Sequence, residues 1–524
     1  MRQLNTMFEP RGKVLNVMIS AACSMGFLLF GYDQGVMGGA IGSSSFVRQF
    51  NHPSPLQQGL ITGLYDLGCL VGSIATFIIG ERLGRRKSIY VGCIIVIVGT
   101  VLQVTARTVA HLIVGRIVTG AGVGIMTSIV PTWQSEVTGA DERGIYLTVQ
   151  SANINTGFVL SNWISLGASY ATSEFQWIFP IAMQVIFAVY LLVTVLFLVE
   201  SPRWVANHIS LDEATRIIAR LHNKDETHED VFKVREEIRL ALEEETPPSW
   251  ADLFRNGCQQ NLRRMLLGFG VLYMQQLTGI NSIAYYFPVV LTEYLPVSSS
   301  MAHIIAAVAA TQYLMFSFVP ILFIERIGRR TILIWGAVAL MVLSALIAVG
   351  FNIPGQGGAI MTCVMYCLFY DAFAMSYLNV PWMYAPEINS LRMRSKGGAI
   401  ASASNWLFNG IVVTVTPSSL ASIGYKYYVV WAVFNASFIP MVYFLYPEVR
   451  GLSLEQIDHI FEGRGYGWSC LTQGVRESVK GAAAIEAARP RATGGDVEAD
   501  PSSENSDKDE PGTVGVENVK RGET

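Results

Sequence analysis

One acidic residue lies inside an apolar stretch long enough to cross a membrane, and its type and position suit proton chemistry. Asp33 belongs to a run at about residues 14–40, where nearby glycines suit close helix packing or a helix break. Moving a carboxylate into a bilayer costs at least about 2.5–3.5 kcal/mol. The cost is tolerated where the acid faces water, pairs with a cation or exchanges a proton. An acid that simply reaches water at a helix end is the alternative, and we favour a proton-coupling carboxylate.

The composition indicates that the helix carrying Asp33 belongs to a polytopic membrane protein. Hydrophobic residues make up 51% of the 524 residues and charged residues only 15%, whereas soluble proteins carry about 25% charged residues. The net charge of −3 gives no argument for a nucleic-acid partner. The seven cysteines lie mostly in apolar runs and are expected to be small buried residues rather than disulfide partners. Because no nucleophile–base set or metal-ligand cluster stands out, we expect no enzyme, no cofactor and no metal site.

Apolar runs of spanning length, about 17–25 residues, recur about twelve times. Arginine and lysine gather strongly on one side of these runs, and the other side has only Arg48, Arg107 and Lys426. The positive-inside rule therefore predicts a multi-pass protein with both termini in the cytoplasm. The expected spans lie at about 14–40, 58–80, 88–106, 109–135, 144–169, 176–199, 264–294, 300–324, 331–351, 358–385, 396–422 and 427–446.

The segments outside the spans differ in composition. At about 207–255 the chain is polar, with apolar residues such as Ala214, Ile218 and Leu221 at helical spacing, which predicts amphipathic helices under the membrane. After residue 462 small and acidic residues predominate, which is typical of a disordered tail. We therefore expect a cytoplasmic N-terminus at 1–13, a six-helix half at 14–199, cytoplasmic linker helices at 200–263, a second six-helix half at 264–451 and a cytoplasmic tail at 452–524.

Three charged patterns recur in the same order at nearly the same interval, which indicates an internal repeat. The sequence of residues 81–86 returns almost unchanged at residues 325–330. The pair Glu136 and Arg143 returns as Glu387 and Arg394, both at the same offset. Glu200 returns as Glu448. Two homologous halves of this kind produce alternating access, with the ligand held between them.

At this point the chain resembles the sugar porter family of the major facilitator superfamily, and most of all its fungal proton-coupled members. The resemblance covers about residues 14–458. It implies an all-α membrane protein with twelve transmembrane helices in two homologous six-helix halves, the major facilitator fold, with cytoplasmic linker helices. The matching motifs are the two repeated charged loops, residues 115–116, 200–203, 275–281, 381–382, 405–406 and 447–451.

Charged residues at the cytoplasmic ends of the spans are expected to form a gate. Pairs between arginine and carboxylate side chains are directional, and pairs that form only when the two halves meet would stabilise the outward-open state. The alternative is that these charges only set the membrane orientation. The predicted gate residues are Glu81, Arg82, Arg85, Glu136, Arg143, Glu200, Arg203, Glu325, Arg329, Glu387, Arg394 and Glu448.

Neutral amides at mid-depth suit the hydroxyl groups of a sugar, because each amide both donates and accepts hydrogen bonds. Counting about 1.5 Å per residue puts Gln275, Gln276, Asn281 and Asn405 near the membrane centre. A single intramembrane amide could instead serve an interhelical hydrogen bond worth roughly 0.6 kcal/mol. The resemblance implies a substrate site made of Gln150, Gln275, Gln276, Asn281, Trp382, Asn405 and Trp406, with the tryptophans stacking on a sugar ring.

Several positions depart from the family pattern, and they leave the substrate open among hexoses, pentoses, disaccharides and polyols. The usual pair of glutamines reads Gln150-Ser151, so one amide is missing. A position that often holds asparagine is Tyr313, and the usual Gly-Pro before residue 381 is absent. An unusual acid, Asp371, lies near mid-depth in the tenth span.

Coupling to protons is expected at Asp33 and Arg116. Both lie in the outer half of their spans and so could pair, which would tie protonation of the acid to conformation. The resemblance then implies a monomeric plasma-membrane importer that moves a sugar or polyol with a proton by alternating access. A facilitative uniporter and a non-transporting sugar receptor are the alternatives.

Overall fold

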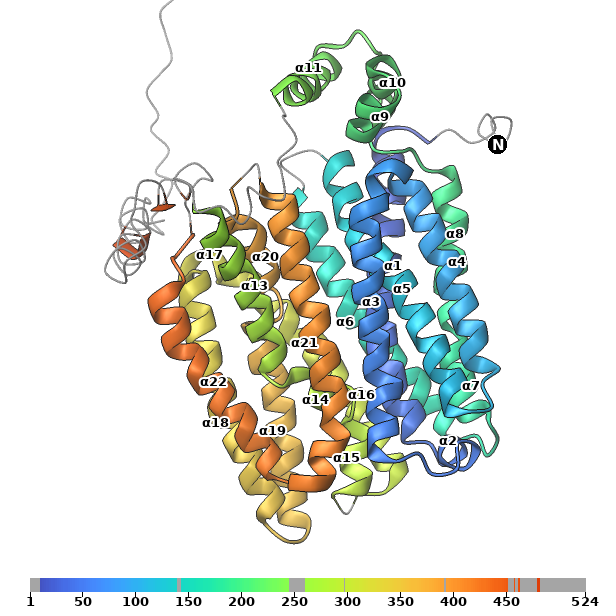
Figure 1. Ribbon diagram of the computed structural model, residues 1–524, viewed down its shortest axis with the longest axis vertical. Helices are drawn as coiled ribbons and strands as arrows, with labels where there is room; N and C mark the ends of the chain where they lie inside the picture. The colour runs from blue at the N-terminus through green and yellow to red at the C-terminus, as the bar shows by residue number, and fades with distance from the viewer. Residues whose placement is uncertain are drawn as a thin grey trace, which may run out of the picture.

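The computed structural model describes residues 10–138, 143–244, 260–295, 297–390, 393–450, 457, 460, 461 and 478–480. Its elements are all helical within those residues (Figure 1). They are α1 (Gly12–Ile41), α2 (Ser44–Gln49), α3 (Pro55–Leu83), α4 (Arg85–Val104), α5 (Val109–Val137), α6 (Arg143–Ser169), α7 (Phe175–Ala182), α8 (Gln184–Phe197), α9 (Pro202–His208), α10 (Leu211–His222), α11 (Glu229–Glu244), α13 (Asn261–Leu277), α14 (Ile280–Ala284), α15 (Phe287–Glu293), α16 (Ser299–Ser317), the 3₁₀ helix η2 (Val319–Leu322), α17 (Ile324–Ile327), α18 (Arg329–Asn352), α19 (Gln356–Met375), α20 (Val380–Ile388), α21 (Arg394–Ile423) and α22 (Lys426–Leu445).

Local signals in the sequence explain where several spans begin. Ser54 caps α3 and forms a capping box with Gln57, and Pro55 occupies the first helical position. Thr108 accepts a hydrogen bond from the backbone N–H of His111 and so caps α5. These caps satisfy orphan N–H groups at the ends of long apolar helices.

Ten spans in the described chain are long and apolar enough to cross a membrane, with the pairs α7–α8, α16–η2 and α19–α20 each forming one span. Two more predicted spans correspond to α6 and to the run of α13, α14 and α15. The first is rich in asparagine and serine, and the second is broken at Gly279.

The helices form two groups that lie side by side in Figure 1, α1–α8 and α13–α22. We call these the N-half and the C-half. One end of the bundle carries α9–α11 and the arginine–glutamate loops, and we call it the charged end. The opposite end carries α2 and α15, and we call it the far end.

The N-half and the C-half contact each other on the side of the bundle nearer the far end. There α3 packs on α21, and a Cβ atom on Gly59 would lie 2.1 Å from the carbonyl oxygen of Thr414. Trp163 of α6 donates a hydrogen bond of 3.0 Å to the hydroxyl of Thr311 on α16. The close approach of α3 to the backbone of α21 needs a small residue at the crossing, which explains the glycine at position 59.

The break between α13 and α14 exposes a backbone carbonyl that a polar side chain then satisfies. Gly279 has φ +91 between α13 and α14, and its missing side chain makes room for the ring of Trp431. Asn435 of α22 donates to the carbonyl of Thr278 at 3.1 Å. Unpaired carbonyls inside a membrane protein require such partners.

The linker helices partly confirm the predicted amphipathic segment. Ala214, Ile218 and Leu221 are buried on α10, and α10 packs on α1 at the charged end. Residues 245–259 of the predicted linker and most of the predicted disordered tail lie outside the described residues. Five cysteines carry free thiols, and Cys258 and Cys470 also lie outside that part of the chain.

Candidate functional site

Asp33 and Arg116 are in contact, as their expected depths predict. The Nη1 atom of Arg116 lies 3.4 Å from Oδ1 of Asp33, and both side chains are 0% exposed. The guanidinium also stacks over the ring of Tyr65 at 4.3 Å, and its Nε faces the carbonyl of Ile61. Removing Arg116 would leave the buried carboxylate of Asp33 without its cation. The geometry therefore makes Asp33 and Arg116 one electrostatic unit, whose role in proton coupling stays a prediction.

Four amides and one acid form a continuous chain of hydrogen bonds across the interface between the halves. Gln276 donates to Oδ1 of Asn405 at 2.6 Å, and Asn281 donates to Oε1 of Gln276 at 2.6 Å. Asn281 also donates to Oδ1 of Asn409 at 2.6 Å, and Asn409 donates to Oδ1 of Asp66 at 3.0 Å. All five side chains are buried. We call Asn405, Gln276, Asn281 and Asn409 the amide chain.

The helix geometry explains why these side chains meet. The break at Gly279 separates α13, which carries Gln276, from α14, which carries Asn281, and turns the two amides toward each other. Asn405 and Asn409 are four residues apart on α21, so they lie on the same helix face. The predicted cluster of Gln276, Asn281 and Asn405 is therefore brought together.

Gln275 differs from the rest of the predicted cluster, because the structure ties it to the backbone. Its Nε2 donates to the carbonyls of Tyr377 and Leu378 at 2.7 and 3.0 Å, in the gap between α19 and α20. Those carbonyls belong to the segment that replaces the usual Gly-Pro. Its Oε1 has no hydrogen-bond partner among the described residues, so this oxygen remains able to accept from a ligand.

The two predicted tryptophans have different surroundings. Trp406 is 1% exposed and packs edge-on against Phe30 of the N-half, with ring centroids 5.1 Å apart. Trp382 on α20 is 40% exposed. Trp406 is therefore occupied by a contact between the halves in this conformation. Gln150 lies on α6, but its side chain is outside the described part of the chain.

An aromatic cluster fills the position where the family often has asparagine. Tyr313 of α16 packs on Phe158 of α6 and Tyr370 of α19, with centroid distances of 6.2 and 5.1 Å. The adjacent residues of α16 and α19 are also in contact, because Nε2 of Gln312 donates to Oδ2 of Asp371 at 2.5 Å.

At the charged end of the N-half, two glutamates hold one loop. Glu136 makes a two-pronged ion pair with Arg85, with Nε–Oε2 and Nη2–Oε1 distances of 2.8 and 2.7 Å, and both side chains are nearly buried. Glu200 accepts hydrogen bonds from the backbone N–H groups of Arg85 and Arg86 at the first turn of α4. Burial raises the pKa of Glu200, while the N–H donors of Ser201, Arg86 and Arg85 oppose the rise.

The C-half repeats this arrangement, so the repeated charged sequences form equivalent contacts in the two halves. Arg329 pairs with Glu387 at 3.3 Å, and Glu448 accepts from the N–H groups of Arg329 and Arg330 at the first turn of α18. Gly84 and Gly328 precede these helices with φ of +84 and +94. A Cβ atom would approach the Glu200 carboxylate to 2.9 Å and the Glu448 carboxylate to 2.5 Å. Each loop therefore needs glycine for two reasons: the backbone has a positive φ, and a side chain would collide with the glutamate carboxylate that binds the loop.

The remaining gate candidates are placed as follows. Glu81 lies 3.3 Å from Arg85 and is more than half exposed, and Arg82 and Arg203 are exposed. Arg394 donates to the carbonyl of Pro386. The side chains of Arg143 and Glu325 are outside the described residues. The observed Arg85–Glu136 and Arg329–Glu387 pairs each join elements of one half, so pairing between the halves remains a prediction for another conformation.

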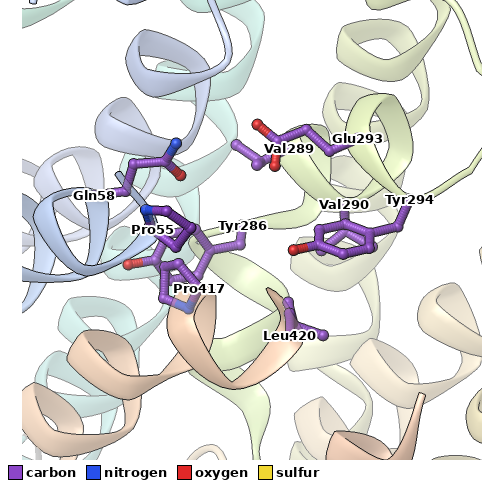
Figure 2. A pocket seen from close by; sticks show the side chains of 9 residues that line it. All are labelled: Pro55, Gln58, Tyr286, Val289, Val290, Glu293, Tyr294, Pro417 and Leu420. Carbon is purple, nitrogen blue, oxygen red and sulfur yellow. The ribbon is translucent and has the colours of Figure 1, made fainter. Parts of the chain in front are cut away.

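At the far end the halves leave little space between them. A small pocket of about 10 Å³ is lined by Pro55 and Gln58 of α3, by α15 and by Pro417 and Leu420 of α21 (Figure 2). That volume holds about one water molecule. The contacts of α3 with α21 and of α6 with α16 join the N-half to the C-half on the side of the far end. The far end is therefore closed in this conformation.

Two residues of this site escaped the sequence analysis, although the sequence contains a signal for each. Asp66 is an acid inside the second apolar run, which is the same signal that singled out Asp33. Asn409 lies one helical turn from Asn405. No group of three or more His, Cys, Asp or Glu side chains in the described chain could hold a metal ion.

Comparison with known proteins agrees with this architecture. The family model described as "Sugar (and other) transporter" matches residues 18–461. The chain is 37% identical over 472 residues to the MFS-type transporter oryC of Aspergillus oryzae, covering 88% of each chain. It is 35% identical over 465 residues to the sugar transporter STL1 of Saccharomyces cerevisiae, covering 86% of this chain and 82% of that protein.

Solved structures share the fold. The inward-open conformation of the xylose transporter XylE from E. coli matches with a TM-score of 0.72 at 22% identity, covering 85% of this chain and 100% of that chain. A second XylE structure, described as a proton:xylose symporter bound to 6-bromo-6-deoxy-D-glucose, matches with a TM-score of 0.70 at 23% identity, covering 86% of this chain and 99% of that chain. The predicted major facilitator fold with twelve spans in two halves is thereby confirmed.

Proposed function

The chain belongs to the sugar (and other) transporter family, and from that premise we propose that it imports a sugar or a polyol together with a proton by alternating access. Members of such a family move a solute across a membrane without a covalent step, so this multi-pass membrane protein is a transporter and not an enzyme. Beyond the family assignment, the proposal states that a proton is co-transported, that transport is inward, and which residues bind the sugar and the proton.

The fully buried contact between Asp33 and Arg116 is the observation that carries the proton coupling. Two opposite charges 3.4 Å apart with no exposed surface are stable together and costly apart. Motion that separates them would favour protonation of Asp33, because a neutral acid tolerates burial better than a carboxylate. This behaviour links one proton to one conformational change.

The amide chain is the proposed sugar site, together with Gln150, Gln275, Trp382 and Trp406. Amides at the interface between the halves can exchange their mutual hydrogen bonds for bonds to sugar hydroxyls. Asn281 is central to this site, because its amide nitrogen donates to the side chains of both Gln276 and Asn409. Pentoses, hexoses, disaccharides and polyols all present such hydroxyls.

We propose that the charged end faces the cytoplasm and that the protein resides in the plasma membrane as a monomer. The positive-inside rule supports this orientation, since basic residues gather at the charged end. With its halves in contact near the far end, the conformation is then closed toward the outside. The boundaries at 13, 199, 263 and 451 remain our domain proposal, and the charged loops remain our proposal for the gate.

Uptake by yeast cells that lack their own sugar transporters tests this function. Radiolabelled D-glucose, D-xylose, maltose and glycerol are offered at an acidic and at a neutral pH, with and without an uncoupler. Wild type is compared with Asp33→Asn, and surface protein is quantified for both. A proton driven by about 100 mV supplies about 2.3 kcal/mol, which corresponds to roughly fifty-fold accumulation.

The symporter predicts concentrative uptake that the uncoupler and Asp33→Asn abolish, while exchange of labelled for unlabelled sugar persists. Uptake that neither the uncoupler nor the substitution changes would make the protein a facilitative uniporter. Absence of uptake for every probe, from protein shown to reach the surface, would favour a non-transporting receptor.

A further inference from the structure

A second acid is fully buried in the membrane-spanning part of the N-half. Asp66 lies on α3, about 17 Å from the far end at about 1.5 Å per residue, and its side chain has no exposed surface. A carboxylate at this depth costs several kcal/mol unless a partner compensates it. Asp66 therefore needs an explanation of its own.

Asp66 lies between the Asp33–Arg116 pair and the amide chain. Its Oδ1 accepts the hydrogen bond from Asn409, and its Oδ2 has no hydrogen-bond partner within the described residues. Arg116 pairs with Asp33 through Nη1, and its Nη2 has no hydrogen-bond partner within the described residues. The other titratable groups facing this cluster are Tyr65 and Cys69 of α3, Tyr285 at the end of α14, and Tyr286.

The charges of this cluster do not balance if both acids are ionised. The cluster holds two carboxyl groups, those of Asp33 and Asp66, and one guanidinium, that of Arg116, and all three side chains are completely buried. Full ionisation would leave one net negative charge without compensation, which is far costlier than a neutral cluster. One proton held by either acid makes the cluster neutral.

We propose that Asp66 shares the transported proton with Asp33 and passes its protonation state to the sugar site through Asn409. This inference rests on the proposed symport and adds the residue that connects proton and sugar. The proton that enters from outside makes the cluster neutral. Its release to the cytoplasm leaves one net negative charge, which favours return of the empty carrier to the conformation that can bind a proton again.

The hydrogen-bond directions supply the connection. An ionised Asp66 accepts from Nδ2 of Asn409, which turns Oδ1 of Asn409 toward the amide of Asn281. A protonated Asp66 can instead donate, which requires the Asn409 amide to reverse and present a donor to Asn281. Asn281 would then lose an acceptor and change the hydrogen bonds it offers to a sugar.

Proteoliposomes with a proton-sensitive dye inside test the proposal. The probes are D-glucose, D-xylose and glycerol, and the readouts are sugar-driven proton entry and the half-saturation constant at an acidic and at a neutral pH. The variants are Asp66→Asn and Asp33→Asn. The matched control is Asp371→Asn, which neutralises an intramembrane acid that pairs with Gln312 instead of Arg116.

We expect the half-saturation constant of wild type to change by about tenfold or more between the two pH values. In Asp66→Asn this dependence should disappear and proton entry should fall, while sugar exchange continues. Asp371→Asn should keep the pH dependence. An Asp66→Asn protein with the wild-type pH profile and wild-type proton entry would overturn the proposal.

A second variant covers the case in which Asp66→Asn does not fold. Asn409→Ala leaves both acids and Arg116 in place and removes the link, so it should lose the pH dependence of sugar affinity. Retention of that dependence in Asn409→Ala would overturn the proposal. Loss of proton entry in Asp33→Asn alone would reject the role of Asp66 and keep the symport. Absence of proton entry in wild type would reject both.

Discussion

Substitution of Asn281 by alanine tests the proposed sugar site in a way that separates binding from folding. Asn281 joins Gln276 to Asn409, with two hydrogen bonds of 2.6 Å. Alanine keeps the helical backbone of α14 and removes the amide. A sugar would then lose one donor and acceptor, and the acceptor oxygens of Gln276 and Asn409 would lose the donor that orients them.

The size of the effect follows from the number of hydrogen bonds. One net hydrogen bond contributes about 0.5–1.5 kcal/mol, and a buried partner left without a bond adds to the cost. A loss of about 1.4 kcal/mol corresponds to a tenfold change in affinity. We therefore expect the half-saturation constant for uptake to rise about tenfold, with a smaller change in maximal rate per transporter at the surface.

Asn435→Ala is the matched control. Asn435 is equally buried in a span, but it donates to the backbone carbonyls of Thr278 and Trp431. Its loss should lower the amount of folded protein and leave the half-saturation constant unchanged. An unchanged constant in Asn281→Ala, or an equal rise in both variants, would refute the assignment of Asn281 to the sugar site.

Two further predictions concern the charged end. Gly84→Ala and Gly328→Ala should each destabilise the detergent-solubilised protein by about 1–3 kcal/mol in a thermal unfolding assay. Gly355→Ala should cost less, because Gly355 has a similar φ of +85 but no atom within 4 Å of its added Cβ; equal losses in all three would remove the role of the carboxylates. Glu136→Gln and Glu387→Gln should slow net uptake about tenfold or more by weakening charge-assisted hydrogen bonds worth about 1.5–3 kcal/mol. Wild-type rates and affinities in both glutamine variants would end the gate assignment.

Much of the architecture could be predicted from the sequence because membrane segments are constrained so strongly. Every spanning backbone must satisfy its own hydrogen bonds, so long apolar runs are necessarily helices. The recurrence of residues 81–86 at 325–330 predicted two homologous halves. The structure explains the recurrence, since Glu200 and Glu448 each bind the first N–H groups of the helix that follows one of these loops.

The pairing of side chains was harder to predict, because it depends on which helices lie next to each other. The expected depth in the membrane was enough to predict the pairing of Asp33 with Arg116, because the two residues lie at similar levels of neighbouring helices. Depth could not show that Trp406 packs on Phe30 of the other half. It also could not show that Gln275 holds the backbone of a break in another span. Each of these contacts joins residues far apart in the chain.

Conformation is the other feature that the sequence does not specify. The gate charges were expected to pair between the halves, whereas in this conformation Arg85 pairs with Glu136 within the N-half. A transporter has at least two arrangements of its halves, and one sequence must serve both. Pairing of these charges between the halves therefore stays a prediction for the other arrangement.

Proton entry driven by sugar tests the central claim most directly. Purified wild-type protein and Asp33→Asn are reconstituted in liposomes that contain a proton-sensitive dye, and D-glucose, D-xylose or glycerol is added outside without an imposed voltage. The account predicts acidification of the interior for wild type with at least one probe, and none for Asp33→Asn, which should still exchange that probe. Sugar entry into wild-type liposomes without any acidification would contradict it.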